Sequence, residues 1–145
     1  MTFNSFAAAR VPGTSAPGST GTGYQPGVCN IGPAEIARRR RAGDVGLLAT
    51  VFLLAILVAI GAPPSVRLLV GLPAAGSAVG YLQAWLRFCA GFGTRGTFNF
   101  GPLGRAEQVS DPESLARDRR RATEIAVAIL AIGIVVAIAA TLLPL

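Results

Sequence analysis

Three long apolar runs, separated by short polar segments, set the pattern of this chain. They cover residues 45–62, 68 to about 88, and 125 to about 143, and the first includes ten consecutive residues, from Val51 to Ile60, without a polar side chain. A helix rises ~1.5 Å per residue, so the 18 residues of the first run cover ~27 Å, close to the ~30 Å hydrocarbon core of a bilayer. The pattern therefore predicts an all-α integral membrane protein with three transmembrane helices.

The segments between the runs indicate how the helices begin and connect. Only residues 63–67 separate the first two runs, which predicts a tight antiparallel helical hairpin. Pro33 and Glu35 are typical of a first helical turn, so the first helix should begin upstream of its apolar part, with an arginine-rich lead-in. Asp111 and Pro112 predict the same for the third helix, whose first turns must then project from the membrane.

Residues 1–28 differ from the rest because glycine, proline, serine and threonine dominate them. Such a segment buries too little apolar area to offset the entropy of ordering, and it lacks the apolar run of a signal peptide. We expect a disordered N-terminal tail over residues 1–28 and a two-span hairpin domain over residues 29–104. Residues 105–145 should form a cytoplasmic helical lead-in and the third span.

Composition narrows the chemistry. Apolar residues make up 52% of the 145 residues and charged residues 14%, against about 25% charged residues in a soluble domain. All 13 basic residues are arginine. The lack of lysine and histidine removes the commonest general base, the commonest metal ligand and any Schiff-base lysine, so we expect no catalytic residue, no metal and no cofactor. Arginine used alone, with abundant alanine and glycine, suggests a GC-rich bacterial genome.

The arginines fall almost entirely on one side of the predicted spans. Five precede the first span and seven lie between the second and third spans, whereas Arg67 alone lies between the first and second. By the positive-inside rule the N-terminus and the long loop are cytoplasmic. Three spans then place the C-terminus outside a bacterial cytoplasmic membrane.

Two arginine clusters beside the spans are interpreted as topology anchors at anionic lipid headgroups, where each arginine contributes ~1 kcal/mol. They comprise Arg38, Arg39, Arg40, Arg41, Arg119, Arg120 and Arg121. The alternative is a nucleic-acid patch. The position of both clusters next to membrane spans favours the lipid bilayer as partner and no nucleic acid.

Small residues four apart suggest where helices pack. Gly76, Gly80 and Ala84 share one face of the second span, and such spacing lets helix backbones approach closely. Ala55 and Ala59 give the first span a similar face, as Gly133 and Ala137 do for the third. We interpret these faces as packing within one chain, with homo-oligomerisation as the alternative.

Cys29 and Cys89 both fall on the predicted cytoplasmic side, where a permanent disulfide is not expected. Arg87 and Arg95 near Cys89 favour its thiolate, whereas the neighbouring phenylalanines oppose it. We expect two inert thiols, and the alternative is a reactive Cys89, with or without Cys29.

The segment after the second span is rich in glycine. Residues 91–96 fit G-x-G-x-x-G, but they follow a membrane span and precede no helical pattern, which favours a flexible, turn-rich exit over a nucleotide site. We expect this loop to insert into the membrane interface through Phe92, Phe98 and Phe100. At the foot of the hairpin, Asp44 and Arg87 are expected to form an interfacial pair.

Residues 30–43 read NIGPAEIARRRRAG, with Gly32, Glu35, Arg39 and Gly43 as the key positions. This run resembles the opening of the YgaP-like inner-membrane transmembrane domain family, and the resemblance covers about residues 30–104. It implies two membrane helices followed by a cysteine, often in a Cys-Pro pair, whereas Ala90 follows Cys89 here. Some members carry a fused rhodanese domain. No such domain is recognisable in this sequence, so sulfur transfer is not implied.

These patterns together predict a small, non-catalytic accessory or structural membrane protein that packs with itself or with a larger membrane complex. The alternative is a cytoplasm-facing thiol redox or persulfide-handling protein that uses Cys89. A small oligomeric transporter or channel is disfavoured, because the spans show no polar stripe.

Overall fold

The computed structural model describes residues 23–144, which fold mainly into helices. In chain order the elements are α1 (Pro33–Ala59), α2 (Pro64–Arg67), the 3-10 turn η1 (Leu68–Val70), α3 (Gly71–Trp85), α4 (Ala90–Arg95), β1 (Thr97–Phe98), β2 (Glu107–Gln108) and α5 (Pro112–Thr141). The predicted disordered tail falls on residues 1–28, of which residues 1–22 lie outside the described part of the chain.

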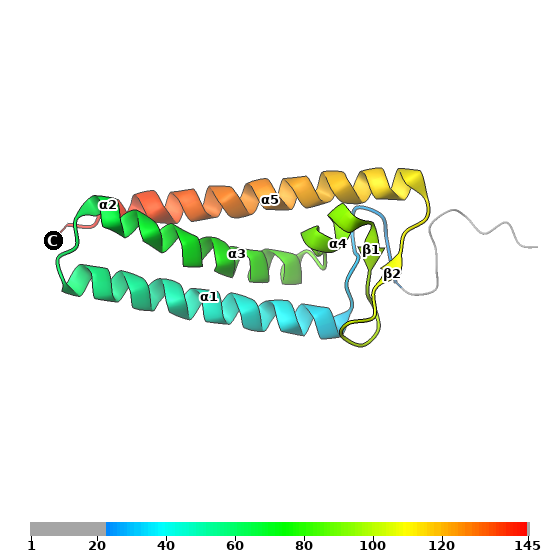
Figure 1. Ribbon diagram of the computed structural model, residues 1–145, viewed down its shortest axis with the longest axis horizontal. Coiled ribbons are helices and arrows are strands. Elements are labelled where there is room, and N and C mark those ends of the chain that lie inside the picture. The colour runs from blue at the N-terminus through cyan, green and yellow to red at the C-terminus, as the bar shows by residue number, and fades with distance from the viewer. Residues whose placement is uncertain (1–22, 145) are drawn as a thin grey trace, which may run out of the picture.

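Three segments of the described chain are long and apolar enough to cross a membrane: Pro33–Ala59, Pro64–Trp85 and Pro112–Thr141. The predicted all-α, three-span fold is therefore confirmed. The second span is the central one, since α3 lies between α1 and α5 and packs against both (Figure 1). Within the most apolar stretch of each span, 39% of the residues are buried in the second against 17% in the other two.

Helices α1 and α5 both begin well before their apolar parts, as their first-turn residues predict. Pro33 opens α1, and Asp111 caps α5. The Asp111 carboxylate accepts hydrogen bonds from the Ser114 backbone N–H at 2.8 Å and from the Ser114 hydroxyl at 2.6 Å. These bonds lower the pKa of Asp111. Helix α5 has 30 residues and therefore extends ~45 Å, so its first turns project beyond a ~30 Å hydrocarbon core.

Glycines bring the backbones of α1 and α3 into direct contact. A Cβ added at Gly80 would lie 2.5 Å from the Gly43 Cα, and one added at Gly46 would lie 2.5 Å from the Ser77 nitrogen. The Ser77 hydroxyl donates to the Gly43 carbonyl at 3.0 Å. Only hydrogen in place of a side chain allows two helices to lie this close.

The contact between α3 and α5 also depends on small residues. A Cβ added at Gly71 would lie 2.7 Å from the Gly133 carbonyl oxygen and 2.8 Å from the Ala137 side chain. By contrast, Ala55 and Ala59 are exposed, so this face of α1 does not pack within the chain, contrary to the prediction. Leu57 is the α1 residue that is buried against the other helices near that end.

At the end of the bundle that holds α2, Arg67 connects α2 to the segments that follow α1 and α5 through hydrogen bonds. Arg67 is 4% exposed. Its Nε donates to the Ala62 carbonyl at 2.8 Å, and its Nη1 donates to the Leu143 carbonyl at 2.9 Å. Arg67 therefore satisfies carbonyls that follow α1 and α5, which their own helices leave without donors.

The opposite end carries a small ordered unit, which we call the polar-end cap and define as residues 23–32 and 86–111 (Figure 1). Here the structure differs from expectation. Residues 23–28, assigned to the tail, form a turn with Tyr24 buried, and residues 90–95, expected to be a flexible loop, form α4 against α5. Phe98 is 4% exposed and stacks on Tyr24 with 4.7 Å between ring centroids, so it does not dip into the interface.

Candidate functional site

Asn30 holds the polar-end cap together. Its side chain donates from Nδ2 to the Cys89 carbonyl at 3.0 Å and accepts the Cys89 N–H at Oδ1 at 2.6 Å. Its backbone N–H donates to the Arg87 carbonyl at 3.1 Å, and its carbonyl accepts the Asn99 N–H at 2.9 Å. Asn30 is fully buried, so these bonds satisfy an amide that would otherwise be costly to bury. The residue opens the family-like run, but nothing in the sequence indicated these partners.

A buried carboxylate lies beneath the first turn of α1. Glu35 is 1% exposed, and its Oε2 lies 3.6 Å from the Arg38 Nε and 3.9 Å from the Arg39 Nε. Its other oxygen accepts the Asn99 Nδ2 donor at 3.5 Å. Arg38 and Arg39 therefore form ion pairs with Glu35, but the buried Glu35 Oε2 accepts no hydrogen bond from either within the described residues.

Cys89 is buried against Arg39. Cys89 is 3% exposed. The Arg39 Nη2 donates a hydrogen bond to the Cys89 Sγ at 2.9 Å. The expected positive neighbours were Arg87 and Arg95. Arg39 takes that place because the packing of α1 on α3 brings together positions 50 residues apart, which sequence distance conceals.

Cys29 has a different environment, and both cysteines are free thiols. The Cys29 Sγ is half-buried and lies 3.8 Å from the Ile31 carbonyl. Burial raises the pKa of the Cys29 thiol, and the nearby Arg87 opposes that shift. This arrangement favours the protonated form of Cys29.

The two arginine clusters lie at the same end of the bundle, at the starts of α1 and α5 (Figure 1). In the second cluster, Arg120 and Arg121 pair with Glu124 at 3.3 and 3.1 Å, and Arg119 is exposed. Exposed pairs of this kind contribute little to stability. In the first cluster, Arg40 and Arg41 are exposed.

Gly76, Gly80 and Ala84 do not share one environment. Gly80 and Ala84 are buried, and Gly80 contacts α1. Gly76 is exposed, and a Cβ added there would meet no atom within 4 Å. A step of four residues turns a helix ~40° beyond a full rotation, so the stripe drifts away from α1 as it runs back to Gly76.

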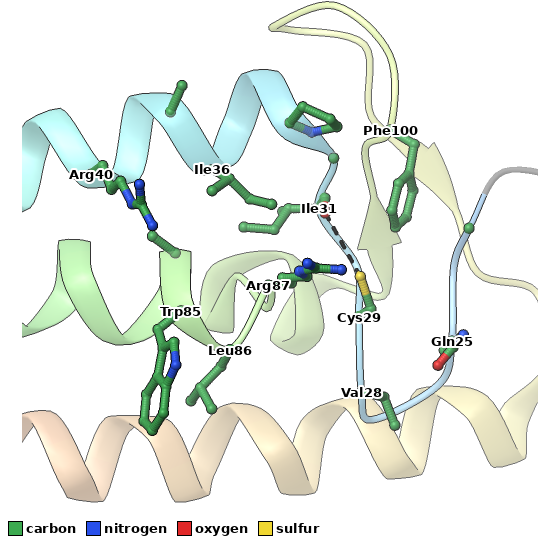
Figure 2. Close-up of a pocket in the computed structure, with 15 residues that line it drawn as sticks. Gln25, Val28, Cys29, Ile31, Ile36, Arg40, Trp85, Leu86, Arg87 and Phe100 are labelled. Carbon is green, nitrogen blue, oxygen red and sulfur yellow. Dashed lines mark hydrogen bonds between the residues drawn. The ribbon is translucent and has the colours of Figure 1, made fainter.

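An open groove lies where the cap meets α1 and the end of α3 (Figure 2). We call it the basic groove; it has a volume of about 820 Å³, and its lining includes Cys29, Arg40, Trp85, Leu86, Arg87 and Phe100. In Figure 2, Arg87 extends toward Cys29, and Arg40 extends from α1 toward the end of α3.

Arg87 is held in an unusual conformation and lacks its expected partner. Its backbone φ is +52°, in the left-handed region that non-glycine residues rarely adopt. Asp44, the predicted partner, instead accepts a hydrogen bond from the Tyr81 hydroxyl at 2.5 Å. Among residues 23–144, Arg87 forms no ion pair, so its guanidinium remains available.

The described residues hold no group of three or more His, Cys, Asp or Glu side chains that could bind a metal ion. No family model matches the chain, and no curated protein or solved structure matches it. The resemblance to the YgaP-like family therefore stays a prediction.

Proposed function

We propose that this chain is a small accessory protein of a bacterial cytoplasmic membrane, with the polar-end cap in the cytoplasm and the C-terminus outside. The orientation is supported by the arginines. Both clusters emerge at the cap end, whereas Arg67 at the other end is buried and bonded to carbonyl groups. Positive charge that faces the cytoplasmic leaflet is the usual arrangement in multi-pass proteins.

The accessory role rests on an outward face of the central helix. Leu69 and Leu72 are 51% and 71% exposed, and Gly76, one helical turn further on, leaves open space beside its backbone. Gly80 and Gly71 are already used within the chain, whereas Gly76 is not. A helix of a second copy or of a larger membrane complex fits such a position, because a glycine lets it approach closely.

A pair of glycine variants tests this role. The full chain is purified in mild detergent, and its assembly size and co-purifying proteins are determined for Gly76→Leu and for wild type. We expect wild type to form an assembly and Gly76→Leu to release a folded monomer of unchanged helix content. A wild-type monomer without any bound protein, or an assembly untouched by Gly76→Leu, contradicts the proposal.

One observation favours a second candidate, a thiol-dependent function at Cys89. A guanidinium donor 2.9 Å from the sulfur is an arrangement found at reactive cysteines, but the residue is only 3% exposed. Alkylation in membranes distinguishes the candidates. Rapid labelling of Cys89 that slows in Arg39→Gln supports the thiol function, whereas slow labelling in both supports the accessory role.

A further inference from the structure

We propose that the basic groove binds the headgroup of one anionic phospholipid, with its phosphate held between Arg40 and Arg87. This inference deepens the proposed function, on which it rests for its placement in the cytoplasmic leaflet. It goes beyond a general attraction of arginine clusters to the bilayer, because it names one binding site and the two residues that select the headgroup.

The charge of the groove suits an anion. Arg40 and Arg87 line it, and none of its lining residues is acidic. Arg87 is free of ion pairs within the described chain, and Arg40 also takes no part in the pairs that occupy Arg38 and Arg39. Guanidinium groups bind phosphate through two parallel hydrogen bonds, which makes arginine the preferred residue for such a site.

The apolar part of the groove suits a lipid better than a soluble phosphate compound. Trp85 and Leu86 line it, and Trp85 is 79% exposed. A second hollow of about 250 Å³ shares Arg40, Ala84 and Trp85 and adds Tyr81 and Leu82, which lie further along the second span. An apolar path therefore leads from the two guanidinium groups toward the membrane interior, as a headgroup with an attached acyl chain requires.

The backbone at Arg87 is an independent indication. Glycine is the usual residue at a left-handed position after a helix, because any side chain there is strained. This chain instead has an arginine at φ +52°, and the Asn30 N–H fixes the Arg87 carbonyl at 3.1 Å. Strain of this kind concentrates at functional positions. The conformation directs the guanidinium into the groove, where it faces Cys29 (Figure 2).

Trp85 makes the site directly measurable, since it is the only tryptophan of the chain and it lines the groove. The full chain is reconstituted into phosphatidylcholine vesicles that contain a small fraction of lipid with brominated acyl chains, which quench tryptophan at short range. The brominated lipid is either phosphatidylglycerol or phosphatidylcholine. We expect half-maximal quenching at a roughly tenfold lower fraction of brominated phosphatidylglycerol, since two arginines act together.

Matched variants separate the site from overall charge. Arg40→Gln with Arg87→Gln should abolish the preference, whereas Arg95→Gln with Arg105→Gln, which removes the same charge outside the groove, should retain it. Arg87→Gly relieves the backbone strain and so should fold at least as well as wild type, yet it should lose most of the preference. An unchanged preference in the groove variants overturns the proposal, as does equal quenching by both lipids in wild type.

A competition arm distinguishes a lipid headgroup from a free phosphate. Millimolar glycerol phosphate added to the vesicles should leave the preference intact, and its abolition overturns the assignment to a lipid. Because both leaflets of these vesicles have the same composition, the result does not depend on orientation. Gly76→Leu, which should not assemble, should show the same preference as wild type. A failure here is therefore distinguishable from a failure of the accessory function.

Discussion

A side chain at Gly80 of α3 would overlap Gly43 of α1, because the added Cβ would lie 2.5 Å from the Gly43 Cα. This approach sets the spacing of the helical hairpin and positions Arg39 and Arg40, which precede Gly43 on α1. The groove and the cap above it therefore depend on a contact between two glycines within the second and first spans.

The first prediction follows from that contact. Gly80→Leu should destabilise the fold by about 3 kcal/mol or more, because the backbone of α1 must move to admit the side chain. Thermal unfolding in detergent, followed by circular dichroism, measures the effect. Gly76→Leu is the matched control: it removes the stability contributed by the proposed assembly, but it should lower the unfolding temperature much less than Gly80→Leu, since a Cβ at Gly76 meets no atom of the chain within 4 Å. Equal effects of the two variants would show that Gly80 does not pack against α1.

The second prediction concerns the amide of Asn30. Asn30→Ala should lower the free energy of unfolding by about 1–3 kcal/mol, because it leaves the buried N–H of Cys89 without an acceptor. The Cys89 carbonyl retains the Gly93 N–H at 2.9 Å. Asn30→Ala should also expose Cys89, so that a maleimide labels this thiol faster. Gln25→Ala removes an exposed amide from the same segment and should change neither stability nor labelling. Unchanged labelling in Asn30→Ala would contradict the role of this residue.

The third prediction concerns alkaline pH. The Tyr24 hydroxyl donates to the Asp118 carboxylate at 2.8 Å, and burial together with this bond raises the pKa of Tyr24 above its ordinary value. A raised pKa means that the folded state favours the neutral phenol. The stability from Tyr24 is therefore complete below pH ~10 and is lost as the pH rises further.

The difference in phenolate absorbance between wild type and Tyr24→Phe reports this titration. It should rise only above pH ~10, and proteolysis near residue 27 should accelerate over the same interval. Tyr24→Phe retains the stacking on Phe98 but lacks the titrating hydroxyl and its hydrogen bond to Asp118. Proteolysis near residue 27 should therefore depend less on alkaline pH in this variant. A Tyr24 phenolate that forms at or below its ordinary pKa would refute the buried hydrogen bond.

The fourth prediction concerns Arg67. Arg67→Ala should cost about 2 kcal/mol, since it leaves the carbonyls of Ala62 and Leu143 without a buried donor. Amide hydrogen exchange should accelerate in the last turn of α5, whereas the start of α5 should be unaffected. Arg41→Ala removes an exposed arginine and serves as control. Equal exchange in both variants would show that Arg67 does not fasten the end of α5.

Periodicity and helix-end residues were sufficient to predict the three spans. Pro33, Asp111 and Pro112 act within one turn of their own position, so the starts of α1 and α5 could be located from local sequence. The polar-end cap could not be predicted in this way. Its bonds join Asn30 to Cys89, 59 positions apart, and Tyr24 to Asp118, 94 positions apart.

The spacing of the glycines was also not sufficient to predict which of them packs against another helix. Gly76 and Gly80 are equivalent by sequence, but only Gly80 lies on the side that meets α1. Which side of α3 faces α1 is determined by the whole hairpin, including the bond from Ser77 to Gly43. The conformation of Arg87 could not be predicted either, because a left-handed backbone is expected at glycine and an arginine gives no indication of it.

The orientation of the chain in the membrane tests the central claim most directly. Reporters fused after Leu145 and before Met1 of the full chain are compared in a bacterial host, one reporter active only in the cytoplasm and one only outside it. The account predicts cytoplasmic activity at the N-terminal fusion and external activity at the C-terminal fusion. External activity at the N-terminus with cytoplasmic activity at the C-terminus, or the same side for both, would contradict it.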